Sequence, residues 1–121
     1  MIMKFEDIYQ FFNNPPPTYL NRELAVCYIL DMILQQEESY GTELIKQLQE
    51  SFPQYRLSDT VLYGALNFLE QSGIVQGYWK KRKGRGRPRK MYKVVLEQKA
   101  QAEDLAQLWR DYVYKNYSRS S

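Results

Sequence analysis

The sequence of 121 residues predicts a mainly α-helical fold with one small β-hairpin. Several stretches repeat apolar residues at helical spacing, two short segments near the C-terminal end are rich in β-forming residues, and a basic run separates these segments. This order, with extra helices at both ends, is that of a winged helix-turn-helix. We expect one domain: a helical arm at 1–20, a winged-helix core at 21–96 with its wing at 79–91, and a dimerisation helix at 97–117.

The first expected helix is a short apolar arm. Between residues 3 and 14, aromatic and aliphatic side chains have helical spacing, and Pro15–Pro17 end the helix. This arm needs something to pack against, either its own core or a second subunit. The next helix, at 21–36, is apolar over most of its surface, which predicts a buried central position. Its Cys27 is expected to be a small core residue.

The remaining elements are bounded by residues with clear conformational preferences. Ser39 and Ser58 are candidate N-caps for two further core helices. Gly73 is expected to end the second of these in the left-handed conformation. Alternating β-forming residues then predict two strands. The expected elements are helices at 40–50, 58–72 and 97–117 and strands at 74–79 and 91–96.

Composition excludes several classes of protein. The sequence has no histidine, which excludes catalytic triads and histidine-based acid–base or metal chemistry. A single cysteine cannot form an intramolecular disulfide or a zinc site, which favours a reducing compartment. No apolar run reaches the roughly 20 residues that span a bilayer, and the acidic N-terminus is unlike a secretory signal. We expect a cytoplasmic, nucleoid-associated protein that is not an enzyme and has no cofactor or metal.

Positive charge is concentrated in one segment. Residues 80–90 read KKRKGRGRPRK and contain eight bases and no acid, whereas the whole chain has 17 bases and 14 acids. Subtracting these eight leaves nine bases against 14 acids. Such a local concentration of cations predicts binding to a polyanion, with double-stranded DNA as the leading candidate. The alternative is a solvated charge run, which is less favoured because this run lies between two strands.

The helix at 58–72 has a surface suited to reading DNA. The face opposite its apolar side carries uncharged hydrogen-bonding groups rather than the Lys and Glu usual on exposed helices. Gly64 costs about 1 kcal/mol relative to Ala, which suggests either close approach to a phosphate or base edge, or tight helix–helix packing. Amide and hydroxyl side chains can read adenine or contact phosphate, and a merely solvated polar face is the alternative. The expected contacts are Ser58, Thr60, Tyr63, Gly64 and Asn67.

The basic run contains a more specific pattern. Arg85-Gly86-Arg87-Pro88 resembles the core of an AT-hook, in which extended Arg-Gly-Arg lies on the floor of an A·T-rich minor groove. Glycine has no Cβ to collide with the groove walls, and proline keeps the segment extended. The alternatives are a basic wing that contacts phosphates only, and a nuclear localisation signal. The expected wing contacts are Lys80, Lys81, Arg82, Lys83, Arg85, Gly86, Arg87, Arg89 and Lys90.

Several motifs resemble the PadR family of winged-helix transcriptional regulators. YGTELI at 40–45, LYGAL at 62–66, LEQSGIV at 69–75 and RKMYKV at 89–94 are similar to that family's second helix, recognition helix, following turn and returning strand. Two positions depart from the family pattern, because Gly64 replaces its usual proline and Val61 its usual threonine. The resemblance implies a homodimeric DNA-binding repressor. The basic tip and aromatic arm are similar to a cyanobacterial branch, which implies regulation of a circadian clock gene.

Partner predictions follow from two apolar stripes near the ends of the chain. Together they exceed what so small a domain readily buries, which predicts a homodimer. Some relatives bind aromatic ligands, but the 11 tyrosines here do not identify an effector. The alternative function is a protein-interaction module whose basic tip binds an acidic partner. The candidate dimer residues are Phe5, Ile8, Phe12, Leu105, Leu108, Trp109 and Tyr112.

Overall fold

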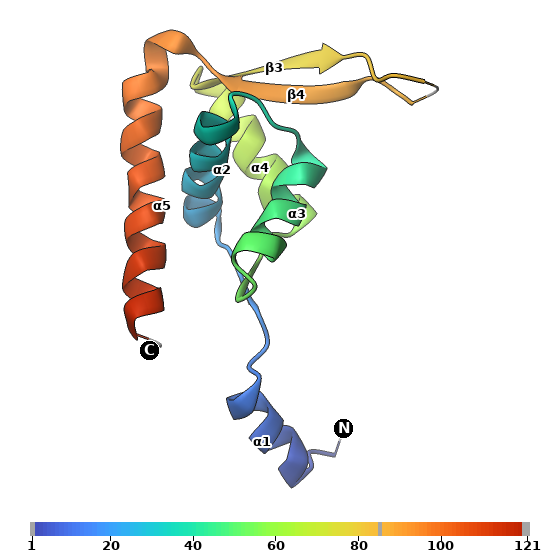
Figure 1. Cartoon of the computed structure of the whole chain (residues 1–121), viewed down its shortest axis with the longest axis vertical. Helices are drawn as coiled ribbons and strands as arrows, with labels where there is room; N and C mark the ends of the chain where they lie inside the picture. Colours follow the sequence, from blue (N-terminus) through green and yellow to red (C-terminus); the bar gives the residue numbers. More distant parts are fainter. Residues whose placement is uncertain (1, 85, 120–121) are drawn as a thin grey trace.

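The computed structural model describes residues 2–84 and 86–119, with side chains of the last helix as far as Asn116. Three helices and a hairpin form a winged helix, which confirms the predicted mainly α-helical fold (Figure 1). No helix in these described ranges is long and apolar enough to cross a membrane. The elements are α1 (Phe5–Asn13), β1 (Thr18–Tyr19), α2 (Arg22–Gln36), α3 (Gly41–Ser51), β2 (Tyr55–Arg56), α4 (Asp59–Gln71), β3 (Val75–Lys80), β4 (Arg89–Val94), a 3-10 turn (Leu96–Gln98) and α5 (Lys99–Arg119).

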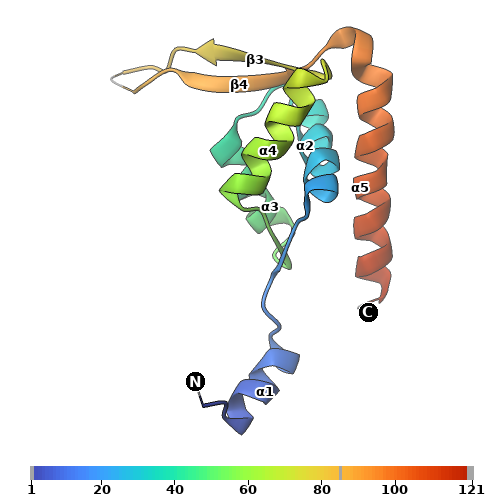
Figure 2. The same cartoon turned by 180° about the vertical axis from the view of Figure 1, so that it is seen from behind.

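Helix α2 is the centre of the core. It lies between α4 and α5 in both views (Figures 1 and 2). An unbroken run from Tyr28 to Ile33 is buried, together with Ala25 and Val26. Burial of these residues explains why apolar side chains cover most of this helix, as the sequence predicted.

Trp109 of α5 closes the core from the outer side of α2. Its side chain is 1% exposed. Its ring lies edge-on to Tyr28, Phe52 and Tyr55 at centroid distances of 5.3, 5.4 and 5.7 Å. Such edge-to-face pairs add about 0.5–1.5 kcal/mol each beyond the burial of apolar area. The protomer therefore buries Trp109 itself, although the sequence placed this residue in a dimer interface.

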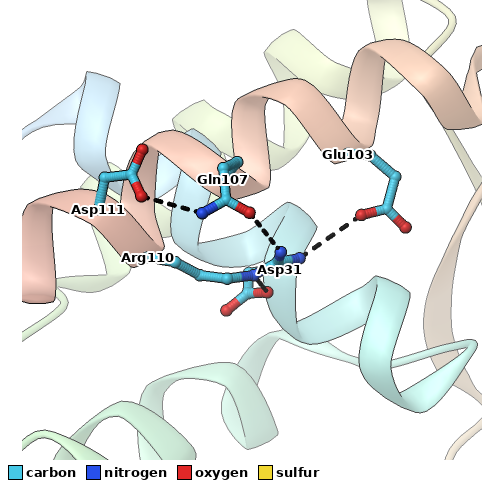
Figure 3. A network of polar contacts seen from close by, with 5 residues as sticks. All are labelled: Asp31, Glu103, Gln107, Arg110 and Asp111. Carbon is cyan, nitrogen blue, oxygen red and sulfur yellow. Dashed lines mark hydrogen bonds and ion pairs between the residues drawn. The ribbon is translucent and has the colours of Figure 1, made fainter.

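A polar network reinforces the contact between α2 and α5 (Figure 3). Asp31 is buried in α2, and its carboxylate accepts a hydrogen bond from Arg110 Nε at 2.8 Å. Arg110 also donates to Gln107 at 2.9 Å and lies 3.5 Å from Glu103. Gln107 in turn donates to Asp111 at 2.9 Å. A buried carboxylate is costly unless it is paired, so Arg110 fixes the position of α5 along α2.

The ends of the core helices agree with the predictions from the sequence at two positions and differ from them at one. Ser58 caps α4 by accepting a hydrogen bond from the Val61 amide at 3.2 Å, and Gly73 has a φ of +78°. The prediction that Ser39 is an N-cap is wrong, because α3 follows Tyr40 without a side-chain cap. The backbone of Ser39 instead exchanges two hydrogen bonds with Tyr92 of β4, at 3.1 and 2.8 Å. This bridge joins the hairpin to the loop before α3.

The two strands of the hairpin have the predicted length but lie closer to the basic tip than the sequence predicted. Strands β3 and β4 are antiparallel, and Lys80 pairs with Arg89 at the outer end. The predicted second strand at 91–96 is therefore wrong at both ends, since β4 begins at Arg89 and Leu96 is exposed in the following turn. The outer half of the hairpin extends past α3 (Figure 1), and the basic side chains at 80–83 are exposed. The tip is reduced to residues 81–88.

A second, very short sheet was not predicted. β1 and β2 pair in parallel, with Thr18 opposite Tyr55 and Tyr19 opposite Arg56. The Thr18 amide also donates to Gln54 O at 2.9 Å. Two residues per strand are too few to produce a recognisable alternation in the sequence. This ladder holds the chain just after its three prolines, and α1 lies beyond it with no buried residue (Figures 1 and 2).

Tyr28 should make stability depend on pH above about 10, the ordinary pKa of tyrosine. Burial, followed by the charges of Asp31 and Glu43, raises the pKa of its hydroxyl, which donates to Leu44 O at 2.7 Å. The folded state holds this proton more tightly than the unfolded state. The contribution of the protonated hydroxyl to the free energy of unfolding is therefore complete below the pKa of the unfolded state and is lost as the pH rises above that value. Tyr28→Phe should cost about 1–2 kcal/mol at pH 7 and reduce the alkaline loss of stability.

Urea unfolding between pH 7 and 11.5 measures both effects. Tyr114→Phe is the matched control, because Tyr114 is an exposed tyrosine of α5. An alkaline loss of stability that is the same in the Tyr28 variant and the unmodified chain would contradict this assignment.

Candidate nucleic-acid interface

The predicted polar face of α4 is a continuous exposed surface. Thr60, Tyr63, Gly64 and Asn67 are all exposed, and Ser58 is half-buried at the cap. The other side of the helix is buried, through Leu62, Ala65, Leu66 and Leu69. The structure thus brings all the α4 residues singled out from the sequence to one surface of the molecule.

Gly64 is not explained by packing within the chain. A Cβ built at this position has no atom of the described structure within 4 Å. Of the two explanations drawn from the sequence, tight helix–helix packing therefore fails within the protomer. The other explanation, close approach of a phosphate or a base edge to the helix backbone, remains.

Tyr63 lies against the start of α3. A Cβ at the buried Gly41 would be 2.8 Å from the Tyr63 hydroxyl, so glycine at this position makes room for the tyrosine. Tyr63 also borders a cleft of about 400 Å³ between the start of α3, α4 and the hairpin. Trp79 is exposed at this cleft. The sequence did not single it out as a binding residue, because it lies within a segment rich in β-forming residues. The cleft is lined by Tyr40, Gly41, Thr42, Tyr63, Trp79, Arg89, Lys90 and Tyr92.

Two lysines of the hairpin are already paired with acids of the helical body. Lys80 Nζ lies 2.8 Å from Glu38 Oε1, and Lys90 Nζ lies 3.2 Å from Glu70 Oε1 at the end of α4. The hydrogen bond that Lys90 donates to Glu70 is the main reason that the pKa of Lys90 is raised. A Cβ at Gly77 would lie 2.6 Å from Glu70 Oε2 and 2.7 Å from Lys90 Cε, so glycine makes room for this pair. Both lysines thus connect the hairpin to the body.

Arg89 is held differently. Its guanidinium lies 3.8 Å from the centre of the Tyr40 ring, which is a cation–π contact. Among the described residues, Arg89 has no acidic partner. Its side chain lines the cleft. Arg89 therefore places a fixed cation between the hairpin and the start of α3.

The tip carries the remaining cations. Lys81, Arg82, Lys83 and Arg87 are exposed, and none of them forms an ion pair with another described residue. Gly84 turns the chain at a φ of +86°. A Cβ at Gly86, which is also exposed, would lie 3.2 Å from Arg82 Nε, so a larger side chain there would also disturb that arginine. The predicted contact Arg85 lies outside the described residues.

The residues predicted for a dimer interface separate into three groups. On α1, Phe5, Ile8 and Phe12 are exposed. On α5, Leu108 is exposed, while Leu105 and Tyr112 are half-buried against the core. Trp109 belongs to the core, as described above. The described residues include no group of three or more side chains that could hold a metal ion.

Comparisons with known proteins agree with this arrangement. The model of the transcriptional regulator PadR-like family matches residues 29–100. No relative was found among curated proteins. The circadian clock associated protein Pex from Anabaena is 63% identical, with a TM-score of 0.86 over 95% of this chain and 99% of that chain. Pex from Synechococcus is 59% identical, with a TM-score of 0.86 over 92% of this chain and 98% of that chain.

A more distant structure shows the same fold. A PadR family transcription regulator from Clostridium difficile is 26% identical, with a TM-score of 0.57 over 79% of this chain and 95% of that chain. The family match covers more than half of the chain, and both Pex structures match nearly all of it. The resemblance drawn from the sequence motifs, including the cyanobacterial branch, is therefore confirmed. The chain belongs to the PadR-like family of transcriptional regulators and is similar to the Pex proteins of cyanobacteria.

Proposed function

We propose that the protein is a homodimeric transcriptional repressor that places α4 in the major groove of DNA and the hairpin tip in an adjacent A·T-rich minor groove. The carrying observation is the cleft that Tyr63 of α4 shares with Trp79 and Arg89 of the hairpin. Because both elements line one cleft, a single duplex can contact the helix and the hairpin together.

The exposed face of α4 suits the major groove. This groove is about 12 Å wide and admits an α-helix, and base edges there present distinct donors and acceptors. Asn67 offers the paired donor and acceptor that adenine requires, and Thr60 a hydroxyl and a methyl group. Gly64 lets the helix backbone approach closely, since no side chain intervenes. In this arrangement Tyr63 donates its hydroxyl to a phosphate.

The tip suits the minor groove. A·T-rich DNA has a narrow minor groove with enhanced negative potential, which attracts inserted arginine. The exposed cations of the tip lie at the end of a projecting hairpin, so they reach the groove beside the one that α4 enters. Lys80 and Lys90 then act as positioning residues, because their pairs with Glu38 and Glu70 set the angle between hairpin and α4.

A homodimer supplies the specificity that one helix lacks. One recognition helix reads a short half-site, whereas a two-fold dimer reads two half-sites about one helical turn, or a multiple of it, apart. We propose that α1 and α5 supply the interface and that the operator controls a circadian clock gene, since the Anabaena relative is a circadian clock associated protein. Footprinting of bound DNA in the native host identifies the operator. If the protein is a repressor, adding it should lower transcription from the promoter that contains this operator.

Arginines of the tip should read A·T content. Replacing Arg85 and Arg87 together by Ala should weaken binding and flatten the preference for A·T over G·C beside the core site. The slope of log affinity against log salt should become shallower, by roughly 0.9 for each phosphate neutralisation lost. Fluorescence anisotropy with two duplexes that differ only in these flanks measures both effects.

The control for the tip is Lys81→Ala, which should weaken binding to both duplexes equally. If the arginine variant also loses affinity equally on both duplexes, the tip is a phosphate clamp and does not read A·T content. Negligible binding of the unmodified chain to any duplex at low salt would favour a protein-interaction module instead.

Gly64→Ala should raise stability and lower DNA affinity. The new methyl group meets open space in the protein and improves helix propensity by about 1 kcal/mol. On DNA the same methyl group occupies the closest approach, and we expect affinity to fall about tenfold, or roughly 1.4 kcal/mol. Urea unfolding and anisotropy measure the two effects. Gln71→Ala, at the far end of α4, is the control, and unchanged affinity of the Gly64 variant would exclude the close approach.

Glu70→Gln should change selectivity more than overall affinity. Removing one negative charge from the protein by itself strengthens binding to all duplexes, as the control Glu50→Gln on α3 should show. Loss of the Glu70–Lys90 pair should in addition loosen the hairpin and reduce the ratio of affinities for A·T-flanked and G·C-flanked duplexes. An unchanged ratio would show that this pair does not position the hairpin.

A further inference from the structure

An aromatic cleft and a cationic cavity meet at one residue of the hairpin. The aromatic cleft is the one of about 400 Å³ between the start of α3, α4 and the hairpin, and four of its lining residues are aromatic. The cationic cavity has a volume of about 330 Å³ and is lined by Lys80, Lys81, Arg82, Lys83, Arg89 and Met91. Arg89 lines both. A ligand that extends from one into the other therefore passes this arginine.

Two aromatic residues of the cleft are largely exposed. Trp79 is 69% exposed and Tyr63 is 51% exposed. Aromatic side chains beside cations bind unpaired nucleobases by stacking, because every base has a π-face. In duplex DNA the bases are stacked on one another and present only their edges in the grooves. A duplex therefore offers Trp79 no base face to stack on, whereas a single nucleotide does.

The cations beside the aromatic cleft are suited to phosphate. The guanidinium of Arg89 lies 3.8 Å from the centre of the Tyr40 ring. A guanidinium held over a ring still has N–H groups that can donate to the oxygens of a phosphate, and its planar fork matches their spacing. In the cationic cavity, Lys81, Arg82 and Lys83 are exposed and form no ion pair with another described residue. Their positive charge is therefore available to an anion.

We propose that the aromatic cleft and the cationic cavity together bind a purine nucleoside triphosphate, which competes with DNA. The base lies against Trp79 and Tyr63, and the phosphates run past Arg89 into the cationic cavity. The aromatic cleft alone would suit many flat molecules, and the cationic cavity alone would suit many anions. A ligand that fills both must join a flat ring system to a chain of negative groups, which is the chemistry of a nucleotide. A purine covers more of the indole than a pyrimidine does.

The nucleotide regulates the proposed DNA site because both ligands need the same groups. Tyr63 and Arg89 belong to the proposed DNA interface, and the cations of the tip are those assigned to the minor groove. A bound nucleotide covers Tyr63 and neutralises part of the tip, so the duplex loses contacts at both places. The competition rests on the proposed function, whereas the binding of the nucleotide does not.

Titration of the full chain with magnesium-free ATP, in the absence of DNA, tests the binding directly. The chain has two tryptophans, and the second, Trp109, is only 1% exposed. Stacking of adenine on Trp79 should reduce the emission of that residue and protect it from the neutral quencher acrylamide, while Trp109 gives a constant background. Calorimetry measures the affinity. Adenosine and inorganic triphosphate should each bind about tenfold more weakly than ATP, or weaker still. Inorganic triphosphate that binds as tightly as ATP would overturn the proposal.

Two pairs of matched variants locate the nucleotide. Trp79→Ala should weaken ATP binding about tenfold, while Trp79→Phe, which keeps a ring, should weaken it less. The control is Tyr78→Ala, because this neighbour on β3 lines neither the cleft nor the cavity. Arg89→Ala should weaken binding about tenfold. Its control is Lys93→Ala, which removes the same charge from β4 and also lines neither. Equal losses in the Arg89 and Lys93 variants, or unchanged binding by Trp79→Ala, would overturn the site.

Anisotropy with a labelled duplex tests the competition and separates this inference from the proposed function. Saturating ATP should raise the apparent dissociation constant of the duplex about tenfold at constant ionic strength, which is held fixed because DNA binding depends on salt. An unchanged dissociation constant would overturn the competition. If the chain binds no duplex even without ATP, the proposed function fails, while the titration without DNA still decides whether the nucleotide binds.

Discussion

Burial of the middle of α2, from Tyr28 to Ile33, is the constraint on which the rest of the structure depends. A helix that is apolar over most of its surface must be covered by neighbours, and α4 and α5 cover opposite sides of it. Two buried polar side chains of α2 are satisfied, since Tyr28 donates to Leu44 O of α3 and Asp31 accepts from Arg110 of α5. The position of α4, and therefore of its exposed face, follows from this packing.

The hairpin is attached to that core by local contacts rather than by a large buried area. The Ser39–Tyr92 bridge and the pair of Lys80 with Glu38 tie it to the loop before α3, and the pair of Lys90 with Glu70 ties it to the end of α4. Exposed ion pairs contribute little to overall stability, typically below about 1 kcal/mol. Their effect here is on orientation, because each joins the hairpin to a different segment. Positive charge in residues 80–90 is thus divided between attachment and the free tip.

Much of this architecture was predictable from the sequence. Helical spacing located the helices, and the cap at Ser58 and the left-handed Gly73 marked the ends of α4, because these signals are local. The fold class and the exposed face of α4 followed from them. What could not be predicted depends on residues far apart in the chain. The partner of Lys80 is 42 residues away, and no periodicity reports such a pair. The same holds for Trp109, since an apolar stripe does not reveal which residues the protomer itself buries.

The tip differs from the rest of the hairpin in how it can evolve. Its described residues at 81–84 and 86–88 are all exposed, and among them only Gly84 has a left-handed φ that disfavours other residues. Substitutions at the other positions therefore leave the core packing and the attachment of the strands untouched. In the proposed complex, the preference for one DNA site over another can therefore differ between relatives through a few changes in this segment. The helices and strands would then carry each new tip without a loss of stability that selection must repair.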